Sequence, residues 1–441
     1  MIKNEDALAT GPLREVALSA IQAGITAAHP ETVVPAQLTL SGSILSVDGT
    51  SYDLDEYDRV VVLGGGNGAG RLATALADLL AARIDSGLVV TDDPTETDTI
   101  EMREGTHPLP SEANRDGTAD LLERAATLGE DDLVLLAITG GGSALLCHPA
   151  EGLSLPEYRE LTESLVESGA TIDEINAVRK HLSRLKGGRL AAVLAPATVC
   201  TLVISDVVGN RLDVIASGPT APDPTTYDDA LGVLSEYDID VPDAAAEILE
   251  AGAAGQRPET PTSGDSAFDA VGTHVLADNR TALDAAAEVC ADAGYTPLLL
   301  ASQIEGEASE VGTVHAGIAA ECVDTGAPEA PPATLLSGGE ATVTVTGDGE
   351  GGPNQEFVLG AGIAANDPEV VVAAVDTDGI DGATDAAGAI LDFETIADES
   401  EAREHLRRND AYGYLDDQNA LVRTGPTGTN VNDLRLVLVA G

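Results

Sequence analysis

Lysine and tryptophan are the residues that this sequence lacks most clearly. The chain of 441 residues contains no tryptophan, and its only lysines are Lys3, Lys180 and Lys186. Its 22 basic residues face 75 acidic ones, which gives a formal charge of −53. Such a charge excludes nucleic acid as the expected partner, because phosphate backbones are bound by basic surfaces. The acidic residues are mixed with aliphatic strands, which is not typical of disorder, and they favour a protein of a very salty cytoplasm.

Cysteine is also scarce. The four cysteines are scattered and none forms a CxxC pair, which excludes a zinc knuckle and a CxxC redox motif. Scattered cysteines of this kind favour a reducing interior. The first fifteen residues lack the apolar core of a signal peptide, and no apolar run is long enough to cross a bilayer. We therefore expect a cytoplasmic protein without a membrane partner.

Strands that alternate with helices organise most of the chain. Two units read as a strand, a glycine loop and a helix, at residues 58–83 and 131–146. This alternation predicts a parallel, doubly wound sheet in the first half and a second α/β region after it. The stretch 251–268 is rich in Gly, Pro, Ser and Thr, which is typical of a linker. We expect two domains, at residues 1–262 and 270–441.

The segment 175–205 contains no acidic residue but holds Lys180, Arg184 and Lys186. Apolar residues at helical spacing predict an amphipathic helix that reaches Leu185 and places Lys180 and Arg184 on one face. A solvated basic face is the ordinary explanation of such a run, but lysine is otherwise almost absent here, so we favour a site for an anion. The buried strand that follows ends at Asp206, where open α/β sheets place their ligands.

Glycine loops follow three of the predicted strands, at residues 64–70, 140–143 and 337–340. Glycines allow close approach of the backbone, and free N–H groups at a helix start favour phosphate or carboxylate. Each loop can equally be a tight turn. The first loop also fits a loose dinucleotide fingerprint, with Asp92 at the end of the next strand. We expect an anion to be bound by the two loops that open helices.

Two loops of the second half carry polar groups that suit a nucleotide or a hydroxy acid. The first runs from Asp376 to Asp385, and its carboxylates could hold Mg²⁺ or simply form Asx-turns. The second runs from Arg423 to Asp433 and is rich in hydroxyl and amide groups, although a plain loop is an alternative. His107 and His148 each precede a proline, and we expect both to be structural.

Several blocks taken together resemble the glycerate 2-kinase family with a MOFRL-type C-terminal domain. They are ITGGGSALL, GATIDEINAVRKHLSRLKGGRLA, ISDVVGN, IASGPTAPDPTTY, LSGGEATVTV, GGPNQEF, DTDGIDGATDAAGA and RTGPTGTNVNDL. The resemblance covers nearly the whole chain. It implies a Rossmann-like α/β/α N-terminal domain, a smaller α/β C-terminal domain and an active site in the cleft between them. It also implies ATP, Mg²⁺ and phosphorylation of the 2-hydroxyl of D-glycerate; some family members carry a hydroxypyruvate reductase label.

Two positions depart from the family pattern. Asn67 stands where the family usually has a lysine, and Pro353 stands where it usually has an arginine. An amide can donate a hydrogen bond but cannot cancel phosphate charge. The alternatives are therefore a kinase of a different sugar acid, a catalytically silent protein that binds a sugar acid or nucleotide, and a hydroxypyruvate reductase. We expect a small hydroxy acid and a nucleotide as ligands, and the sequence leaves room for a homodimer.

Four roles are assigned from these observations. The residues predicted to neutralise charge and to take part in catalysis are Lys180, Arg184, Lys186 and Asp206. Substrate contacts fall to Asn67, Ser143, Asn354 and Glu356. Nucleotide contacts fall to Gly140, Gly141, Gly142, Thr424, Gly425, Thr427 and Asn430. The predicted Mg²⁺ ligands are Asp206, Asp378 and Asp381.

Overall fold

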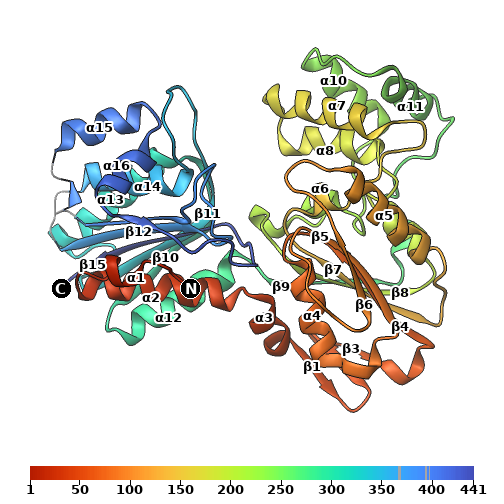
Figure 1. Cartoon of the computed structure of the whole chain (residues 1–441), viewed down its shortest axis with the longest axis horizontal. Helices are drawn as coiled ribbons and strands as arrows, with labels where there is room; N and C mark the ends of the chain where they lie inside the picture. The colour runs from red at the N-terminus through yellow and green to blue at the C-terminus, as the bar shows by residue number, and fades with distance from the viewer. Residues whose placement is uncertain (366–368, 393–394, 397) are drawn as a thin grey trace. The chain divides into compact units, whose positions relative to one another are not determined.

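The computed structural model describes residues 1–365, 369–392, 395–396 and 398–441, which form two compact units (Figure 1). Pro30–Leu276 form the central unit, whereas Met1–His29 and Ala277–Gly441 together form the terminal unit. The domains predicted at 1–262 and 270–441 differ from these units in two respects. The first 29 residues group with the C-terminal part of the chain, and the loop 251–268 lies inside the central unit.

The central unit is built on a six-stranded sheet with the strand order β6-β5-β4-β7-β8-β9. Strand β4 pairs in parallel with β5 and β7, and parallel pairing continues from β5 to β6 and from β7 to β8. This is the doubly wound order that the sequence predicts. The strands are β4 (Arg59–Gly65), β5 (Ser86–Thr91), β6 (Ile100–Glu104), β7 (Asp132–Ile138), β8 (Thr198–Ile204) and β9 (Val271–Ala277).

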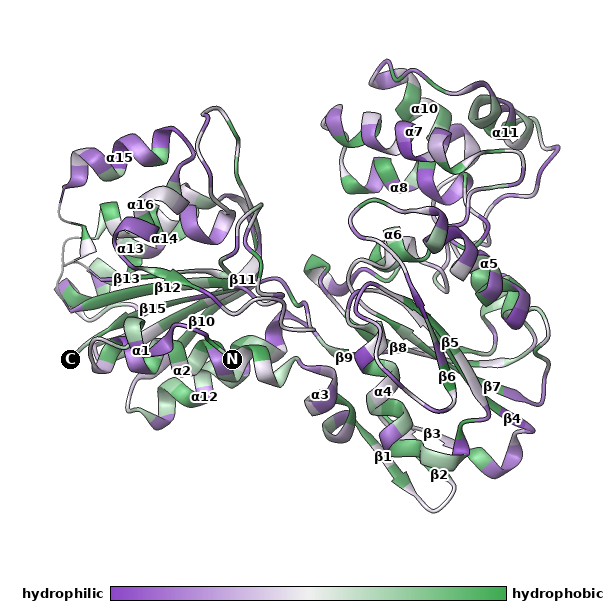
Figure 2. Cartoon of the chain, viewed as in Figure 1, coloured by the Kyte–Doolittle hydropathy of each residue, from purple (hydrophilic) through white to green (hydrophobic). Residues whose placement is uncertain are grey.

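Burial of both faces explains why these strands are continuously apolar. Every residue of β7 is buried, as expected for a parallel strand with helices on both sides. Figure 2 shows hydrophobic colour along the strands of this sheet. The helices that follow the strands are α4 (Ala69–Leu80), α5 (Glu112–Ala125), α6 (Gly142–Leu145) and α9 (Arg189–Leu194).

Two smaller modules complete the central unit. A cluster of helices has its own apolar core, which includes Leu161, Val178 and Leu234; its members are α7 (Leu155–Glu167), α8 (Ile172–His181), α10 (Tyr227–Glu236) and α11 (Asp243–Ala253). A three-stranded antiparallel sheet follows the helix α3 (Pro30–Gln37). Its strands are β1 (Leu38–Ser41), β2 (Ile44–Val47) and β3 (Thr50–Asp53).

The terminal unit contains a mixed sheet with the order β10-β11-β15-β12-β13-β14. Only the β10–β11 pairing is parallel among those described, so this α/β region is not a second parallel sheet. The last strand of the chain lies in the middle of the sheet. The strands are β10 (Thr296–Glu307), β11 (Ala333–Thr342), β12 (Val370–Asp376), β13 (Gly388–Asp392), β14 (Leu421–Val422) and β15 (Asp433–Val439).

Alternate residues of β12 pack on opposite faces of this sheet. Val371 and Ala373 join the core formed by α2 and α12, whereas Val372 and Ala374 join the core under α13 and α14. Helices therefore cover both faces (Figure 1). They are α1 (Glu5–Leu8), α2 (Pro12–Ala27), α12 (Asn279–Asp292), α13 (Ala308–Thr325), α14 (Pro353–Ala364), α15 (Glu399–Arg407) and α16 (Ala411–Asp417).

Two predicted helices end differently from expectation. The sequence from Glu5 to Ala28 reads as one helix, but the structure divides it into α1 and α2, and α2 begins at Pro12. The basic helix expected to reach Leu185 ends at His181, so Arg184 lies in an irregular turn and not on a helix face with Lys180. In the part of the chain that the structure describes, no helix combines the length and apolarity needed to cross a membrane.

Candidate active site

Two glycine loops meet at the carboxyl ends of β4 and β7. In the sheet, β4 lies between β5 and β7, and the strand order reverses direction at β4. The crevice outside the strand ends at such a point is where open α/β sheets bind ligands. The Asn67 N–H donates to the Gly140 carbonyl at 2.8 Å, and the Gly68 N–H donates to Thr139 Oγ1 at 3.0 Å. The first and second glycine loops of the sequence therefore form one surface.

Close packing at this surface requires glycine. Gly141 has φ +75°, and a Cβ atom there would collide with the side-chain oxygen of Asn67. A Cβ atom on Gly140 would collide with the carboxylate of Asp206, which follows β8. The structure thus brings Asn67, Gly140, Gly141 and Asp206 together, while their predicted roles stay predictions.

His107 also lies at this site, although we expected it to be structural. Its Nδ1 atom lies 3.4 Å from Asn67 Nδ2, and a Cβ atom on Gly141 would lie 3.1 Å from its ring carbon Cδ2. The oxygen of the Asn67 amide is buried and has no hydrogen-bond partner within the described residues. Since His107 follows β6, a strand of the same parallel sheet, its position after a strand is the signal that could have identified it.

Lys186 lies behind the second loop and is fully buried. Its ammonium donates to the carbonyls of Ser143 at 2.7 Å and Leu146 at 3.0 Å, at the end of α6. Burial lowers the pKa of Lys186 to about 8. The predicted substrate contact of Ser143 stays a prediction; the Ser143 hydroxyl lies 2.9 Å from that of Ser217.

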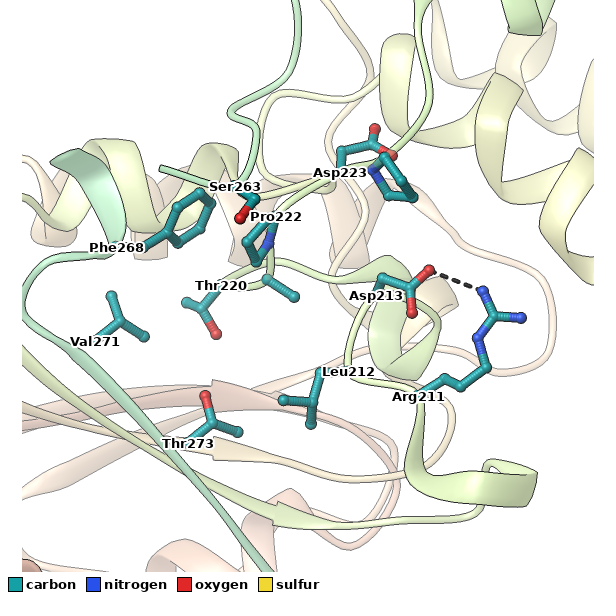
Figure 3. A pocket seen from close by; sticks show the side chains of 12 residues that line it. Arg211, Leu212, Asp213, Thr220, Pro222, Asp223, Ser263, Phe268, Val271 and Thr273 are labelled. Atoms are coloured by element: carbon teal, nitrogen blue, oxygen red, sulfur yellow. Dashed lines mark hydrogen bonds and ion pairs between the residues drawn. The ribbon is translucent and has the colours of Figure 1, made fainter. Parts of the chain in front are cut away.

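Lys180 forms a buried ion pair. Its ammonium lies 3.2 Å from Asp223 and 4.0 Å from Asp213. Asp223 Oδ1 also accepts from the Thr225 N–H, whereas its other oxygen is buried and has no hydrogen-bond partner among the residues that the structure describes. Both aspartates line a cavity of about 610 Å³, and Phe268 is also part of its lining (Figure 3). The positive charge of Lys180 is thus compensated by carboxylates of the chain itself.

Arg184 differs from the two lysines because it is exposed and lines another cavity, together with Arg189 and Arg257. The structure therefore does not keep the three predicted cations in one group. Their predicted contact with substrate phosphate stays a prediction. The ammonium groups of Lys180 and Lys186 already bind acceptors of the protein itself.

In the terminal unit, Asp381 holds the start of α14. Its carboxylate accepts the N–H groups of Asn354 at 3.0 Å and Gln355 at 2.9 Å. Pro353 occupies the first turn of this helix, where the absence of an N–H group costs nothing. Burial raises the pKa of Asp381 to about 7, although the two N–H bonds act in the opposite direction. Both carboxylate oxygens of Asp381 are thus engaged by the protein.

Asn354 and Glu356 are buried near the same helix start. The Asn354 amide donates to Asp433 at 2.6 Å, and Glu356 accepts from Asn409 at 2.9 Å. Burial raises the pKa of Glu356. Their predicted contact with substrate stays a prediction, since both groups have partners inside the unit.

The loop from Asp376 to Asp385, rich in Asp and Gly, contacts the hydroxyl-rich loop from Arg423 to Asp433. The Thr427 N–H donates to the Asp378 carbonyl at 2.9 Å, and the Thr427 hydroxyl donates to the Thr377 carbonyl at 2.7 Å. Thr424 and Gly425 pack on Gly379 so closely that a Cβ atom there would collide with them. The predicted nucleotide loop thus adjoins the predicted metal loop.

Local turns explain part of the acidic loop. Asp376 accepts from the Asp378 N–H at 3.0 Å, and Asp378 accepts from the Ile380 N–H at 2.8 Å, which are Asx-turns. The pKa of Asp376 is raised by burial, and the neighbouring Asp378 and Asp433 carboxylates add to the effect. Among the described residues, no group of three or more His, Cys, Asp or Glu side chains is arranged to hold a metal ion.

Comparison with known proteins connects this site to named relatives. A family model described as a domain of unknown function, DUF4147, matches residues 16–250, and the MOFRL family model matches residues 333–433. The D-glycerate 2-kinase of Thermotoga maritima is 41% identical over 391 residues, which cover 87% of this chain and 91% of that protein. A putative hydroxypyruvate reductase of Agrobacterium vitis is 42% identical over 391 residues, covering 86% of this chain and 87% of that protein.

A solved structure shows the same fold over the whole chain. The crystal structure of a glycerate kinase from Thermotoga maritima superposes with a TM-score of 0.85 at 37% sequence identity. The match covers 97% of this chain and 99% of that one. The two-part α/β architecture described above is therefore that of this crystal structure.

Proposed function

Because the chain belongs to the glycerate 2-kinase family, we propose that it transfers the γ-phosphoryl group of ATP to the 2-hydroxyl of D-glycerate. The observation that carries the proposal is the meeting of Asn67, Gly140–Gly142 and Asp206 at the carboxyl ends of β4, β7 and β8. Backbone N–H groups next to a carboxylate supply what phosphoryl transfer needs, namely an anion cradle and a proton acceptor.

In this reaction the Asp206 carboxylate accepts the proton of the substrate hydroxyl. The hydroxyl oxygen then forms a bond to the γ-phosphorus while the bond from that phosphorus to the β–γ bridging oxygen breaks, and ADP leaves. The N–H groups of Gly140 and Gly141 donate to the phosphoryl oxygens, whereas the Gly142 N–H donates to the Thr139 carbonyl at 3.3 Å and shapes the turn. The Asn67 amide contacts the hydroxy acid. His107 orients Asn67 through the 3.4 Å contact of their nitrogens.

Lys180 and Lys186 act in this proposal as positioning residues. Lys186 holds the carbonyls at the end of α6 and so fixes the loop that precedes this helix. It also adds positive charge under the loop where phosphate charge accumulates. Lys180 fixes the segment around Asp223 in the same way. Neither ammonium needs to leave its internal partners for this role.

As the alternative to its role as proton acceptor, Asp206 would hold Mg²⁺ together with substrate phosphates, and the predicted metal contact of Asp378 stays a prediction. The fit rests on the chemistry of the donors, since Mg²⁺ usually takes one or two carboxylates and keeps water and phosphate as its other ligands. Asp381 fits less well because its oxygens accept N–H groups of α14. When bound, the ion neutralises phosphate charge. The Thr424–Asn430 loop would contact the nucleotide, and Asn354 and Glu356 would support the helix start beside it.

One observation favours a kinase of a different sugar acid as the second candidate. The buried oxygen of Asn67 lacks a partner among the described residues and can accept a hydrogen bond from an additional hydroxyl of the acceptor. A reductase is disfavoured by the first loop. Gly64, the first glycine of the loose fingerprint, lies inside β4 and not in the turn that a dinucleotide fingerprint requires. The active-site position between domains, the salty cytoplasm and the homodimer stay predictions.

The test is an assay of Asp206→Asn beside Asp92→Asn. Both carboxylates follow a parallel strand of the same sheet, and Asp92 is exposed. With ATP, Mg²⁺ and a panel of sugar acids in molar KCl, ADP formation should fall by about 100-fold or more in Asp206→Asn. It should remain near the wild-type rate in Asp92→Asn. Equal rates in both variants would overturn the assignment of Asp206.

The panel also separates the candidate functions. ADP formation with D-glycerate supports the first proposal, and ADP formation only with another acid supports the second. NADH oxidation with hydroxypyruvate, followed in parallel, would overturn both in favour of a reductase. Tight binding of ATP without any turnover would indicate a silent binding protein.

A further inference from the structure

Three arginines that form no ion pair with any described residue lie in one cavity of the central unit. Among the described residues, fourteen of the 19 arginines form a salt bridge with Asp or Glu. Three of the other five, Arg184, Arg189 and Arg257, line a cavity of about 720 Å³. In a chain of charge −53 a guanidinium readily finds a carboxylate, so three without one in a single cavity call for a different partner.

These arginines come from three separate segments. Arg184 lies in the turn after α8, Arg189 begins α9, and Arg257 lies in the loop after α11. Arg189 donates to the Tyr227 hydroxyl at 3.2 Å, which holds its side chain in the cavity wall. Convergence of three chain segments on one cavity is typical of a built site and not of a charge run along one helix face.

Two buried donors in the cavity wall lack a hydrogen-bond partner among the described residues. They are Arg189 Nε and the hydroxyl of Thr260. Thr260 has a relative exposure of only 2%. A buried donor without a partner is destabilising, and two in one wall indicate that a bound group supplies the acceptor. Both can donate, so the expected group is an acceptor with several oxygens.

The carboxylates of the cavity do not fill this role. The Glu259 carboxylate accepts a hydrogen bond from the Tyr227 N–H at 3.3 Å. It also lies 3.2 Å from His181 Nε2. Asp265 accepts the Ala267 N–H at 3.0 Å. Glu151, the third carboxylate of the lining, is exposed. The arginines therefore face a cavity whose acidic groups are mainly occupied by the protein.

We propose that this cavity binds a small phosphorylated anion, at a site separate from the glycine-loop surface. Guanidinium groups match the geometry of phosphate oxygens and form paired hydrogen bonds with them. Arg184 and Arg257 contact the phosphate, while Arg189 and the Thr260 hydroxyl donate from the wall. The rest of the cavity accommodates a short carbon chain. The proposal assigns Arg184 to this site and does not depend on the reaction that the enzyme catalyses.

The test is a titration with inorganic phosphate and with 2-phosphoglycerate, followed by isothermal calorimetry at one fixed KCl concentration. Arg257→Gln should weaken binding at this site about tenfold or more, since it removes a charge-assisted pair of bonds. Arg280→Gln is the control, because Arg280 is exposed and paired with Asp284 in the terminal unit. Equal affinities in wild type, Arg257→Gln and Arg280→Gln would overturn the proposal.

Thr260→Val gives a second, independent readout. The Thr260 hydroxyl makes no hydrogen bond in the described structure, so its removal should leave the thermal stability of the ligand-free protein unchanged or raised. The affinity for phosphate should nevertheless fall about threefold to tenfold. Anomalous scattering from selenate soaked into crystals should place the anion between Arg184 and Arg257. Selenate bound only at the glycine loops would overturn the proposal.

Discussion

Replacement of Lys186 by methionine tests the electrostatic account of the glycine-loop surface most directly. The ammonium donates to two carbonyls, of Ser143 and Leu146, and methionine fills a similar volume without donating. Lys186→Met therefore leaves two buried acceptors at the end of α6 without a donor. It also removes a buried charge, which favours the variant. The balance between these effects depends on pH, because only the wild type has a group that titrates there.

The pH dependence follows from the two pKa values of Lys186. Burial lowers its pKa from 10.5 to about 8 in the folded protein. Below pH 8 both states hold the proton, and the folded state bears the cost of a buried charge. Between the two pKa values the unfolded chain binds more protons, so the free energy of unfolding rises with pH. From about pH 7 to about pH 9.5, one group with these pKa values adds about 2 kcal/mol to wild-type stability.

The assay is urea unfolding at constant KCl, followed by circular dichroism because the chain has no tryptophan. The free energy of unfolding of the wild type minus that of Lys186→Met should grow by about 2 kcal/mol between about pH 7 and about pH 9.5. Groups that titrate in both proteins cancel in this difference. Lys3→Met controls for the loss of a lysine, since Lys3 is exposed and belongs to the terminal unit.

Amide exchange localises the effect. Residues 142–147 should lose protection in Lys186→Met, and peptides of the terminal unit should not. A stability difference that is the same at both pH values would refute the conclusion that burial lowers the pKa of Lys186 in the folded protein. Unchanged exchange at residues 142–147 would refute its role in holding α6.

Two pairs of glycine substitutions test close packing, each with a matched control. Gly141→Ala should lower stability by at least about 1 kcal/mol more than Gly152→Ala and should abolish kinase turnover; both glycines have positive φ, but only at Gly141 does the new Cβ collide with a side chain. Equal melting temperatures for the two variants would contradict this. On α13, Gly317→Ala should raise stability by about 0.5 to 1 kcal/mol, because the site is open. Gly312→Ala should lower it, since the new Cβ meets the main chain of α14; two stabilised variants in thermal unfolding would refute that packing.

The parallel sheet and the place of Asp206 could be predicted from the sequence because both depend on local patterns. Fully apolar runs of strand length between helical segments specify β4, β7 and β8, and the residues after such strands lie at one edge of the sheet. The convergence of two glycine loops and Asp206 follows from this rule. The rule applies equally to His107, which we did not assign to the site.

The end of the basic helix could not be predicted from apolar spacing. Leu182 and Leu185 continue the helical period, but the Ser183 hydroxyl accepts the N–H groups of Leu185 and Lys186 at 3.3 Å. Such side-chain bonds to the backbone compete with a helix, and α8 ends at His181. Because of this turn, Lys180, Lys186 and Arg184 lie in different surroundings: Lys180 pairs with Asp223, Lys186 binds carbonyls at α6, and Arg184 lines another cavity.

The partners of the cations were also beyond sequence analysis. Asp223 lies 43 residues after Lys180, and the carbonyl of Ser143 lies 43 residues before Lys186. No local pattern specifies these pairs. Similarly, the apolar face of α2 does not reveal that it packs on α12 and β15 at the other end of the chain.

The construction of the terminal unit from both ends of the chain has a consequence for synthesis on the ribosome. Its sheet is incomplete until β15 emerges, because this last strand pairs with both β11 and β12. The apolar face of α2, made first, must wait for partners synthesised hundreds of residues later. The central unit is contiguous and can fold meanwhile. Nascent chains therefore contain a folded central unit and an incomplete terminal unit until the final residues are added.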